Sequence, residues 1–410
     1  MDMLKGFDPM SPEFRANPYP YYDFMRNGMP IFYLGEWNMW FCTRYEDCVA
    51  LLRDNRLGQE ILRVKSREEM GFISNDDLSP ERIGLRRLQS SWMVFRDPPD
   101  HTRLRGLVHK AFTPRMIAQL EGRITEVANQ LLDDVQARGE MDLVEDFAVP
   151  LPVIVIAEML GVPLEDQEQF RTWSRAMAGT LDLLGNTYDR VFDEAAKAAI
   201  EFAAYFKDLA DQRRADPQDD LLTALVEAEE AGDRLTEDEL ISTITFLLVA
   251  GHETTVNLIG NGTLALLNNP DQFDLLKADP EKHVKSAVEE MLRYDSPVQM
   301  TARWVLDDVE RDGNRFEVGH QVAIMFAAAN RDPARFENPN TFDITRENNR
   351  HLAFGNGIHF CLGAPLARVE AQIAFHRLCE RMPNLQLATD TPEYRKTYLL
   401  RGLKHLPVTF

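Results

Sequence analysis

The stretch LTEDELISTITFLLVAGHETTVNLIGNGTLALLNNP, residues 235–270, constrains the fold of this chain more than any other segment. Its apolar residues recur at helical spacing, and Thr236 with Glu239 has the sequence pattern of a capping box at a helix start. A helix over this span is far longer than the average of about 11–12 residues in globular proteins. We therefore expect one long helix that crosses the whole molecule.

Most of the remaining chain also has helical patterns. Residues 115–139 end at a glycine typical of a helix C-terminus, and residues 188–217 end at an Asp-Pro pair. Strands are few: residues 30–44 predict a hairpin, and residues 299–333 predict several short strands joined by turns. No repeat or Gly/Ser linker divides the sequence. We expect a mainly α fold with a small β region, in a single large domain over residues 1–410.

The composition argues against several kinds of partner. The formal net charge of −21 disfavours nucleic acid and anionic membrane, because both are polyanions. The N-terminal MDMLKGFDPMSPEF lacks the apolar core of a secretion signal. The most apolar run, residues 244–251, is followed at once by His252 and Glu253 and is too short to span a bilayer. We expect a cytoplasmic protein without a membrane anchor.

Four cysteines in a chain of 410 residues do not predict a disulfide framework. Neither CxxC nor CxxCH occurs, which disfavours structural zinc and excludes covalent c-type haem attachment. Cys42, Cys48 and Cys379 are most simply small buried residues. Cys361 differs from them because of its neighbours.

Cys361 lies in the glycine-rich run FGNGIHFCLG, residues 354–363, and Pro365 follows in what should be the first turn of a helix. The positive end of a helix dipole favours thiolate over thiol, and a thiolate is a nucleophile or a metal ligand. A nucleophile normally needs a histidine base, but His359 need not face the sulfur. A lone cysteine could also be a buried structural residue in a helix-capping loop.

The run 354–363 resembles the haem-binding signature of the cytochrome P450 family, Phe-x-x-Gly-x-His-x-Cys-x-Gly, with every fixed position matched. The resemblance implies haem b, with Cys361 as the proximal thiolate ligand of the iron. It also implies a fold in which the haem lies between the long central helix and the helix after the cysteine loop. The loop residues that it assigns to the cofactor are Phe354, Gly355, His359, Cys361 and Gly363.

AGHETT, residues 250–255, places a polar cluster in the middle of the long apolar helix, which is costly unless the cluster is paired or hydrated. It could be a threonine-rich turn that faces solvent. It is also similar to the oxygen-binding groove of the family, Ala-Gly-x-acid-Thr. That similarity implies that Glu253 and Thr254 relay protons to dioxygen, and that Ala250 and Gly251 leave room above the iron.

VEEMLRY, residues 288–294, places Glu290 and Arg293 on one helix face. An exposed pair of this kind is commonplace, but the pair matches the family's Glu-x-x-Arg, which implies a buried structural pair that supports the cysteine loop. The family often completes this pair with an arginine in a Pro-x-Arg-Phe element. Thr341 stands at that position here, so we expect the third member to be missing or to come from Arg335 or Arg346.

Residues 101–116 contain several basic residues and no acidic one, in an otherwise acidic chain. A solvated helix face would also have this pattern. The resemblance implies that haem propionates bind His101, Arg105, Arg303 and His359. We expect the remaining basic residues of this segment, Arg103 and Lys110 among them, to attract an acidic electron donor.

The resemblance covers nearly the whole chain and implies a monooxygenase that inserts one oxygen atom of O2 into a substrate. A peroxide-using peroxygenase and a non-catalytic haem-based sensor are the alternatives, and the Glu253–Thr254 pair favours the monooxygenase. We expect a monomer that receives electrons from a ferredoxin or flavodoxin and its reductase. We also expect a lipophilic small-molecule substrate, in a pocket lined by Met93, Val94, Ala250, Val298 and Met300.

Overall fold

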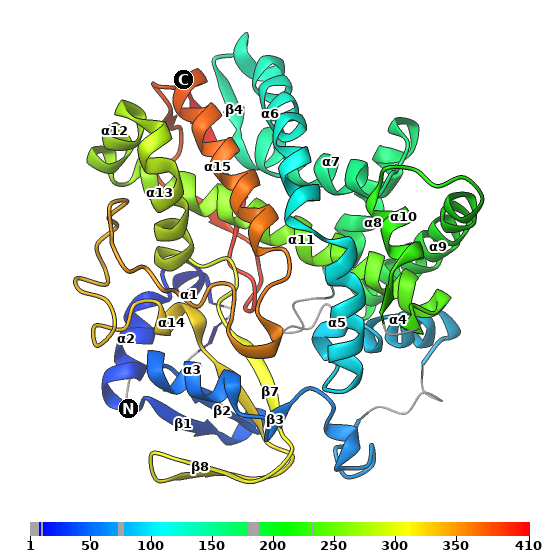
Figure 1. The fold of residues 1–410 in the computed structure, drawn as a ribbon. Coiled ribbons are helices and arrows are strands. Elements are labelled where there is room, and N and C mark those ends of the chain that lie inside the picture. The colour runs from blue at the N-terminus through cyan, green and yellow to red at the C-terminus, as the bar shows by residue number, and fades with distance from the viewer. Residues whose placement is uncertain (1–7, 10, 73–77, 179, 181–187, 231–232) are drawn as a thin grey trace. The chain divides into compact units, whose positions relative to one another are not determined.

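The computed structural model of the protein describes residues 8–9, 11–72, 78–178, 180, 188–230 and 233–410. Most of these residues lie in helices, and the strands form small sheets (Figure 1). Among the described helices, none combines the length and the apolar character needed to cross a membrane. The mainly α architecture with a small β region is therefore confirmed.

The helices and strands have the following bounds. The helices are α1 (Pro12–Ala16), α2 (Tyr19–Gly28), α3 (Tyr45–Arg53), α4 (Pro80–Ser90), α5 (Asp100–Ala111), α6 (Pro114–Gln136), α7 (Pro150–Met159), α8 (Gln167–Ala178), α9 (Tyr188–Ala215), α10 (Leu221–Glu227), α11 (Glu237–Leu267), α12 (Pro270–Ala278), α13 (Pro280–Tyr294), α14 (Phe326–Ala329) and α15 (Ala364–Arg381). The strands are β1 (Ile31–Leu34), β2 (Met39–Cys42), β3 (Leu57–Gly58), β4 (Glu140–Asp142), β5 (Glu229–Glu230), β6 (Asp233–Arg234), β7 (Thr301–Val305), β8 (Val309–Arg311), β9 (Asn314–Phe316), β10 (Gln321–Ile324), β11 (Gln386–Leu387), β12 (Glu393–Tyr394), β13 (Leu403–His405) and β14 (Pro407–Thr409).

The chain packs as two compact units. The first unit comprises residues 1–57, 121–151 and 254–410, and the second comprises residues 58–120 and 152–253. Three helices, α6, α7 and α11, run along the chain from one unit into the other.

The long helix expected from the sequence is α11, which is 31 residues long. Its capping box is formed in both directions: the backbone N–H of Glu239 donates to Thr236 Oγ1 at 3.3 Å, and the backbone N–H of Thr236 donates to Glu239 Oε2 at 2.9 Å. These two bonds satisfy amides that the first turn of a helix leaves without intrahelical partners. The helices expected over 115–139 and 188–217 are confirmed as α6 and α9.

The main sheet has the strand order β1-β2-β10-β7-β3, and all its residues except Gly58 of β3 belong to the first unit. β1 and β2 pair antiparallel with Ile31 opposite Cys42, so the expected hairpin is confirmed. β10 pairs parallel with β2 and antiparallel with β7, which joins the hairpin to the strands expected in residues 299–333. The end of that predicted strand region is instead the short helix α14, an Ala-rich turn that is fully buried.

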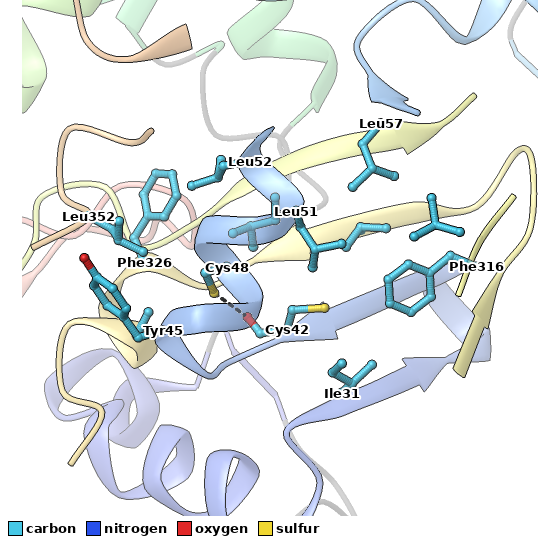
Figure 2. Packing of buried hydrophobic residues seen from close by; sticks show 14 of the residues in the cluster. Ile31, Cys42, Tyr45, Cys48, Leu51, Leu52, Leu57, Phe316, Phe326 and Leu352 are labelled. Atoms are coloured by element: carbon cyan, nitrogen blue, oxygen red, sulfur yellow. Dashed lines mark hydrogen bonds between the residues drawn. The ribbon is translucent and has the colours of Figure 1, made fainter. Parts of the chain in front are cut away.

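Helix α3 packs its apolar face on this sheet, and Cys48 and Leu51 of this helix share one buried hydrophobic cluster with Phe316 and Phe326 (Figure 2). The Cys48 thiol donates to the carbonyl of Cys42 at 3.3 Å. Burial raises the pKa of both thiols, so they stay protonated at neutral pH. The prediction that these cysteines are small buried residues is confirmed, and Cys379 is only 5% exposed as well.

Candidate active site

The cysteine loop leads into α15 through a tight sequence of turns. The N–H of Cys361 donates to the carbonyl of Phe354 at 2.9 Å, which closes the loop on itself. Gly355 and Gly357 have φ values of 72° and 73°, in the left-handed region that favours glycine. Cys361 is half-buried and stands just before the first turn of α15. Its thiol therefore lies near the positive end of that helix dipole, as the sequence predicted.

The end of α3 supports the loop from one side. A Cβ placed on Gly357 would lie 2.5 Å from the carbonyl oxygen of Leu52, closer than any side chain could approach. Arg53 Nε donates to Asn356 Oδ1 at 2.8 Å. Gly357 is thus required both by its backbone conformation and by the close approach of α3.

Helix α13 contributes a buried ion pair. Glu290 and Arg293 are both 0% exposed, and two N–H groups of the guanidinium donate to the two carboxylate oxygens at 2.7 and 2.8 Å. Glu290 also accepts from the N–H of Asp343 at 2.9 Å and from Asn349 Nδ2 at 3.1 Å. The prediction of a buried structural pair is confirmed. The pair fixes the segment that precedes the cysteine loop.

The third member of this network is Arg346. Its Nε lies 3.2 and 3.1 Å from the two carboxylate oxygens of Glu290. Arg335 instead holds its guanidinium 5.2 Å from the ring centroid of Tyr45. Thr341 contributes its backbone carbonyl, which accepts from Arg293 at 3.0 Å. Of the two arginines that the sequence left open, the structure therefore selects Arg346.

A second acidic residue of α13, Glu289, connects to Phe354 of the cysteine motif. Arg368 of α15 donates to both Glu289 oxygens at 2.6 and 2.9 Å, and His351 Nε2 lies 3.1 Å from Glu289 Oε2. The Arg368 guanidinium also lies 4.5 Å from the Phe354 ring centroid. Burial raises the pKa of Glu289, but the hydrogen bonds from Arg368 and His351 outweigh it and lower the pKa to about 2.

The four residues expected to hold haem propionates lie in two groups. In the first unit, Arg303 on β7 is 7% exposed and donates to Thr301 Oγ1 at 2.8 Å, and His359 is half-buried in the cysteine loop. In the second unit, His101 is 2% exposed and Arg105 half-buried, one turn apart on α5. Buried cationic and N–H donors of this kind suit carboxylate ligands.

Helix α11 carries the polar cluster in its middle, as predicted. Glu253 is 7% exposed and lies in the second unit, and Thr254, which follows it, is half-buried in the first. A Cβ on Gly251 would have no atom of the described chain within 4 Å, so this side of the helix is open to a bulky group. The solvent-facing alternative does not fit Glu253, which is buried.

Two contacts of this cluster were not anticipated. His252 Nδ1 lies 2.8 Å from Ser174 Oγ, and Thr255 hydrogen-bonds the buried Glu370 of α15. A sequence signal existed for Glu370: it lies between Leu366 and Ala374 at helical spacing, on the face of α15 that should be apolar. No sequence pattern singled out Ser174.

The residues expected to line the substrate pocket vary in burial. Met93 and Met300 are 5% and 7% exposed, and Val94, Ala250 and Val298 are half-buried. Met300 packs in a hydrophobic cluster of the first unit with Phe14, Tyr22 and Tyr398, among others. Val298 likewise packs against another cluster of the first unit, which includes Leu51 and Phe316. All five pocket residues stay predictions.

These residues fit an iron porphyrin. In the first unit, a half-buried thiol at a helix N-terminus can supply a thiolate ligand, and the buried Arg303 suits a propionate. In the second unit, Gly251 leaves α11 open to a bulky group, and the buried His101 suits a propionate. A cysteine loop held by α3, α13 and α15, together with a long helix that carries an acid–alcohol pair, defines a haem-thiolate enzyme.

Comparison with known proteins agrees with this class. The family model for cytochrome P450 matches residues 71–392. The polyketide biosynthesis cytochrome P450 PksS of Bacillus subtilis (strain 168) is 44% identical over 98% of each chain. The crystal structure of P450BioI in complex with hexadec-9Z-enoic acid ligated acyl carrier protein is similar at a TM-score of 0.88 and 42% identity, over 97% of this chain and 99% of that one. Myxobacterial CYP267B1 in complex with myristic acid is similar at a TM-score of 0.87 and 43% identity, over 98% of both chains.

The chain belongs to the cytochrome P450 family. It is therefore a haem b monooxygenase with the P450 fold, which uses externally supplied electrons and dioxygen to hydroxylate a small molecule.

Proposed function

We propose that the Cys361 thiolate would hold the haem iron. This proposal rests on the structure of the loop that contains Cys361. The N–H of Cys361 donates to the carbonyl of Phe354, and α3 packs closely against the loop at Gly357. When bound, the haem supplies an iron centre that activates dioxygen with two electrons. The reaction balances as substrate R–H + O2 + 2 e⁻ + 2 H⁺ giving R–OH + H2O.

Glu253 and Thr254 deliver the two protons in this proposal. The buried carboxyl of Glu253 can hold a proton, and the Thr254 hydroxyl can accept it and pass it on. His101 and Arg105 of the second unit, and Arg303 and His359 of the first, would hold the haem propionates by hydrogen bonds and balance their charge.

The ligand assignment is tested by the absorption spectrum of the dithionite-reduced protein with carbon monoxide. We expect the long-wavelength Soret band of thiolate-ligated haem for the wild type and its loss in Cys361→Ser. Cys379→Ser is the matched control, because Cys379 lies buried on α15 away from the loop. A long-wavelength band that persists in Cys361→Ser would contradict the proposal.

We propose that the substrate is a long acyl chain, free or attached to a carrier protein. P450BioI was crystallised with a carrier-linked C16 acyl chain and CYP267B1 with myristic acid, and PksS is named for polyketide biosynthesis. These ligands share an extended hydrocarbon body, which suits the apolar residues expected in the pocket. A titration with myristic acid should shift the haem spin state. A shift with a steroid such as testosterone but not with myristic acid would contradict the acyl assignment.

The electron donor is proposed to be an acidic ferredoxin or flavodoxin that docks beside α5. Lys110 on this helix is exposed, and Arg103 binds Glu239 and, at 3.3 Å, Asp233 within the same unit. The exposed charge of Lys110 lies on the surface of this helix, where it can attract the donor. Lys110→Glu should slow reduction at low salt and lose this effect at high salt, while Lys282→Glu, at an exposed position on α13 outside the basic segment, serves as the control. Equal rates for Lys110→Glu and wild type at low salt would contradict the site.

We also propose that the protein works as a cytoplasmic monomer. The four cysteines are free thiols, which suits a reducing compartment. Size-exclusion chromatography monitored at the Soret band should give the mass of one chain plus haem, and a larger mass would contradict the monomer.

A further inference from the structure

A buried polar contact holds the turn of α11 that carries Glu253. Ser174 Oγ of α8 lies 2.8 Å from Nδ1 of His252, the residue directly before Glu253. Ser174 is 0% exposed and His252 5% exposed, and both belong to the second unit. Because water has no access to replace a lost partner, removal of either side chain leaves the other group with an unmade hydrogen bond.

The local sequence explains why this turn needs an anchor. Gly251 gives the backbone more freedom than any other residue, and the β-branched Thr254 and Thr255 are weaker helix formers than the leucines before them. The direction in which Glu253 points therefore depends strongly on what fixes its neighbours.

The packing of helix α8 on helix α9 fixes the position of the Ser174 hydroxyl. Phe170 and Trp173 of α8 pack on Phe202 of α9, with ring centroids 6.2 and 5.8 Å apart. Trp173 Nε1 also donates to Glu201 Oε2 at 2.9 Å. Ser174 follows Trp173 directly, so this packing fixes the position of its hydroxyl as well.

We propose that Ser174 and His252 are a positioning pair for Glu253. Their hydrogen bond fixes the α11 turn, so that the Glu253 carboxyl is held in the orientation that passes protons to Thr254. The inference rests on the proposed relay role of Glu253 and Thr254. When the contact is lost, more of the consumed dioxygen leaves as hydrogen peroxide, by O2 + 2 e⁻ + 2 H⁺ giving H2O2, with the electrons supplied by NADPH through the redox partner.

The test uses the haem-loaded enzyme with a surrogate ferredoxin, its reductase and NADPH, and with myristic acid as the probe. The two readouts are the hydrogen peroxide formed per NADPH consumed and the backbone hydrogen exchange of peptides spanning residues 248–256. Ser174→Ala and His252→Gln should raise the peroxide yield at least about threefold. They should also speed exchange about tenfold, which corresponds to one lost hydrogen bond.

His252→Asn is the matched rescue variant, because its side-chain amide can occupy the position of Nδ1 and keep the bond to Ser174. It should resemble the wild type in both readouts. The melting temperature and the carbon monoxide spectrum show whether each variant keeps its fold and haem. If His252→Asn behaves like His252→Gln, or if the peroxide yield rises only in proportion to lost haem, the pair is structural and the proposal is wrong.

Glu253→Gln and Thr254→Ala are reference variants in the same assay. If they raise the peroxide yield while Ser174→Ala and His252→Gln leave it at the wild-type level, the positioning role is wrong and the relay stands. If the reference variants leave the yield unchanged, the relay itself is wrong and the positioning role falls with it.

Discussion

Glu370 is a buried acidic residue on α15. Burying its carboxyl group lowers the free energy of unfolding by an amount that is large for a single residue. Glu370 is 3% exposed, and its neighbours on the helix, Ala371, Ala374 and Phe375, are apolar and buried. Burial raises the pKa of Glu370 to about 8, and the hydrogen bond with Thr255 offsets only part of that rise. The carboxyl is therefore mostly protonated at neutral pH, and ionising it must destabilise the fold.

The pH dependence of stability should follow from this raised pKa. Between pH 4.5, the ordinary pKa of a glutamate, and about 8, the folded protein binds more protons here than the unfolded chain does. Stability should thus be highest below this window and fall as the pH rises through it, by about 3–5 kcal/mol in total. Glu370→Gln, which carries no charge, should remove this slope and be the more stable form at pH 8–9.

Urea unfolding across this pH range checks the prediction. Glu380→Gln is the matched control, because Glu380 lies on the same helix and is 44% exposed. If Glu370→Gln keeps the wild-type slope between pH 5 and pH 8, the carboxyl is not the titrating group.

Gly357→Ala should destabilise the cysteine loop. The new methyl group would meet the Leu52 carbonyl at 2.5 Å, and alanine at a φ of 73° is strained in any surroundings. We expect a loss of about 1–3 kcal/mol and weaker haem retention, measured as Soret absorbance per protein. Gly122→Ala on α6 is the control, because a Cβ there meets no atom within 4 Å. Equal haem retention in the two variants would show that α3 does not constrain the loop.

At the level of helices and strands, the sequence predicts what depends on local pattern. Helix α11 follows from apolar spacing and a capping box, and the hairpin of β1 and β2 from alternation around a turn. The cysteine loop follows from one contiguous motif. Local sequence patterns do not predict contacts between distant segments. Arg335 and Arg346 are equivalent candidates in the sequence, and only the packing of residues 337–346 brings Arg346 to Glu290. Ser174 likewise gains its role only because α8 meets α11 at His252.

The network around Glu290 gives a prediction at this scale. Arg346→Met would leave the fully buried Glu290 carboxylate with less positive charge than it requires, while Arg293 alone remains paired with it. We expect a loss of about 2–4 kcal/mol in the free energy of unfolding, measured in urea. Arg335→Met, which removes a stacked guanidinium and no bond to Glu290, should cost less than about 1.5 kcal/mol. The assignment of Arg346 as the third member would be wrong if Arg335→Met were the more damaging change.

At the scale of the whole molecule, the sequence predicts one large domain, and the chain packs as two compact units. Helices α6, α7 and α11 continue along the chain from one unit into the other. A helix unfolds cooperatively, because each residue depends on the hydrogen bonds of its neighbours. A structural change in one unit should therefore be transmitted through these helices, and we expect the two units to unfold together.

Tryptophan fluorescence can report on one unit at a time. Trp92 and Trp173 lie buried in the second unit, and Trp37, Trp40 and Trp304 lie in the first. A protein with phenylalanine at the last three positions therefore reports only on the second unit. In this background we introduce Arg346→Met, a change in the first unit, and heat the protein at a fixed rate. The thermal midpoint seen by fluorescence should fall by a few degrees, and the midpoint seen by circular dichroism should fall by the same amount. A fluorescence midpoint that stays in place while the circular dichroism curve splits would mean that the units unfold separately, and the single-domain prediction would be wrong.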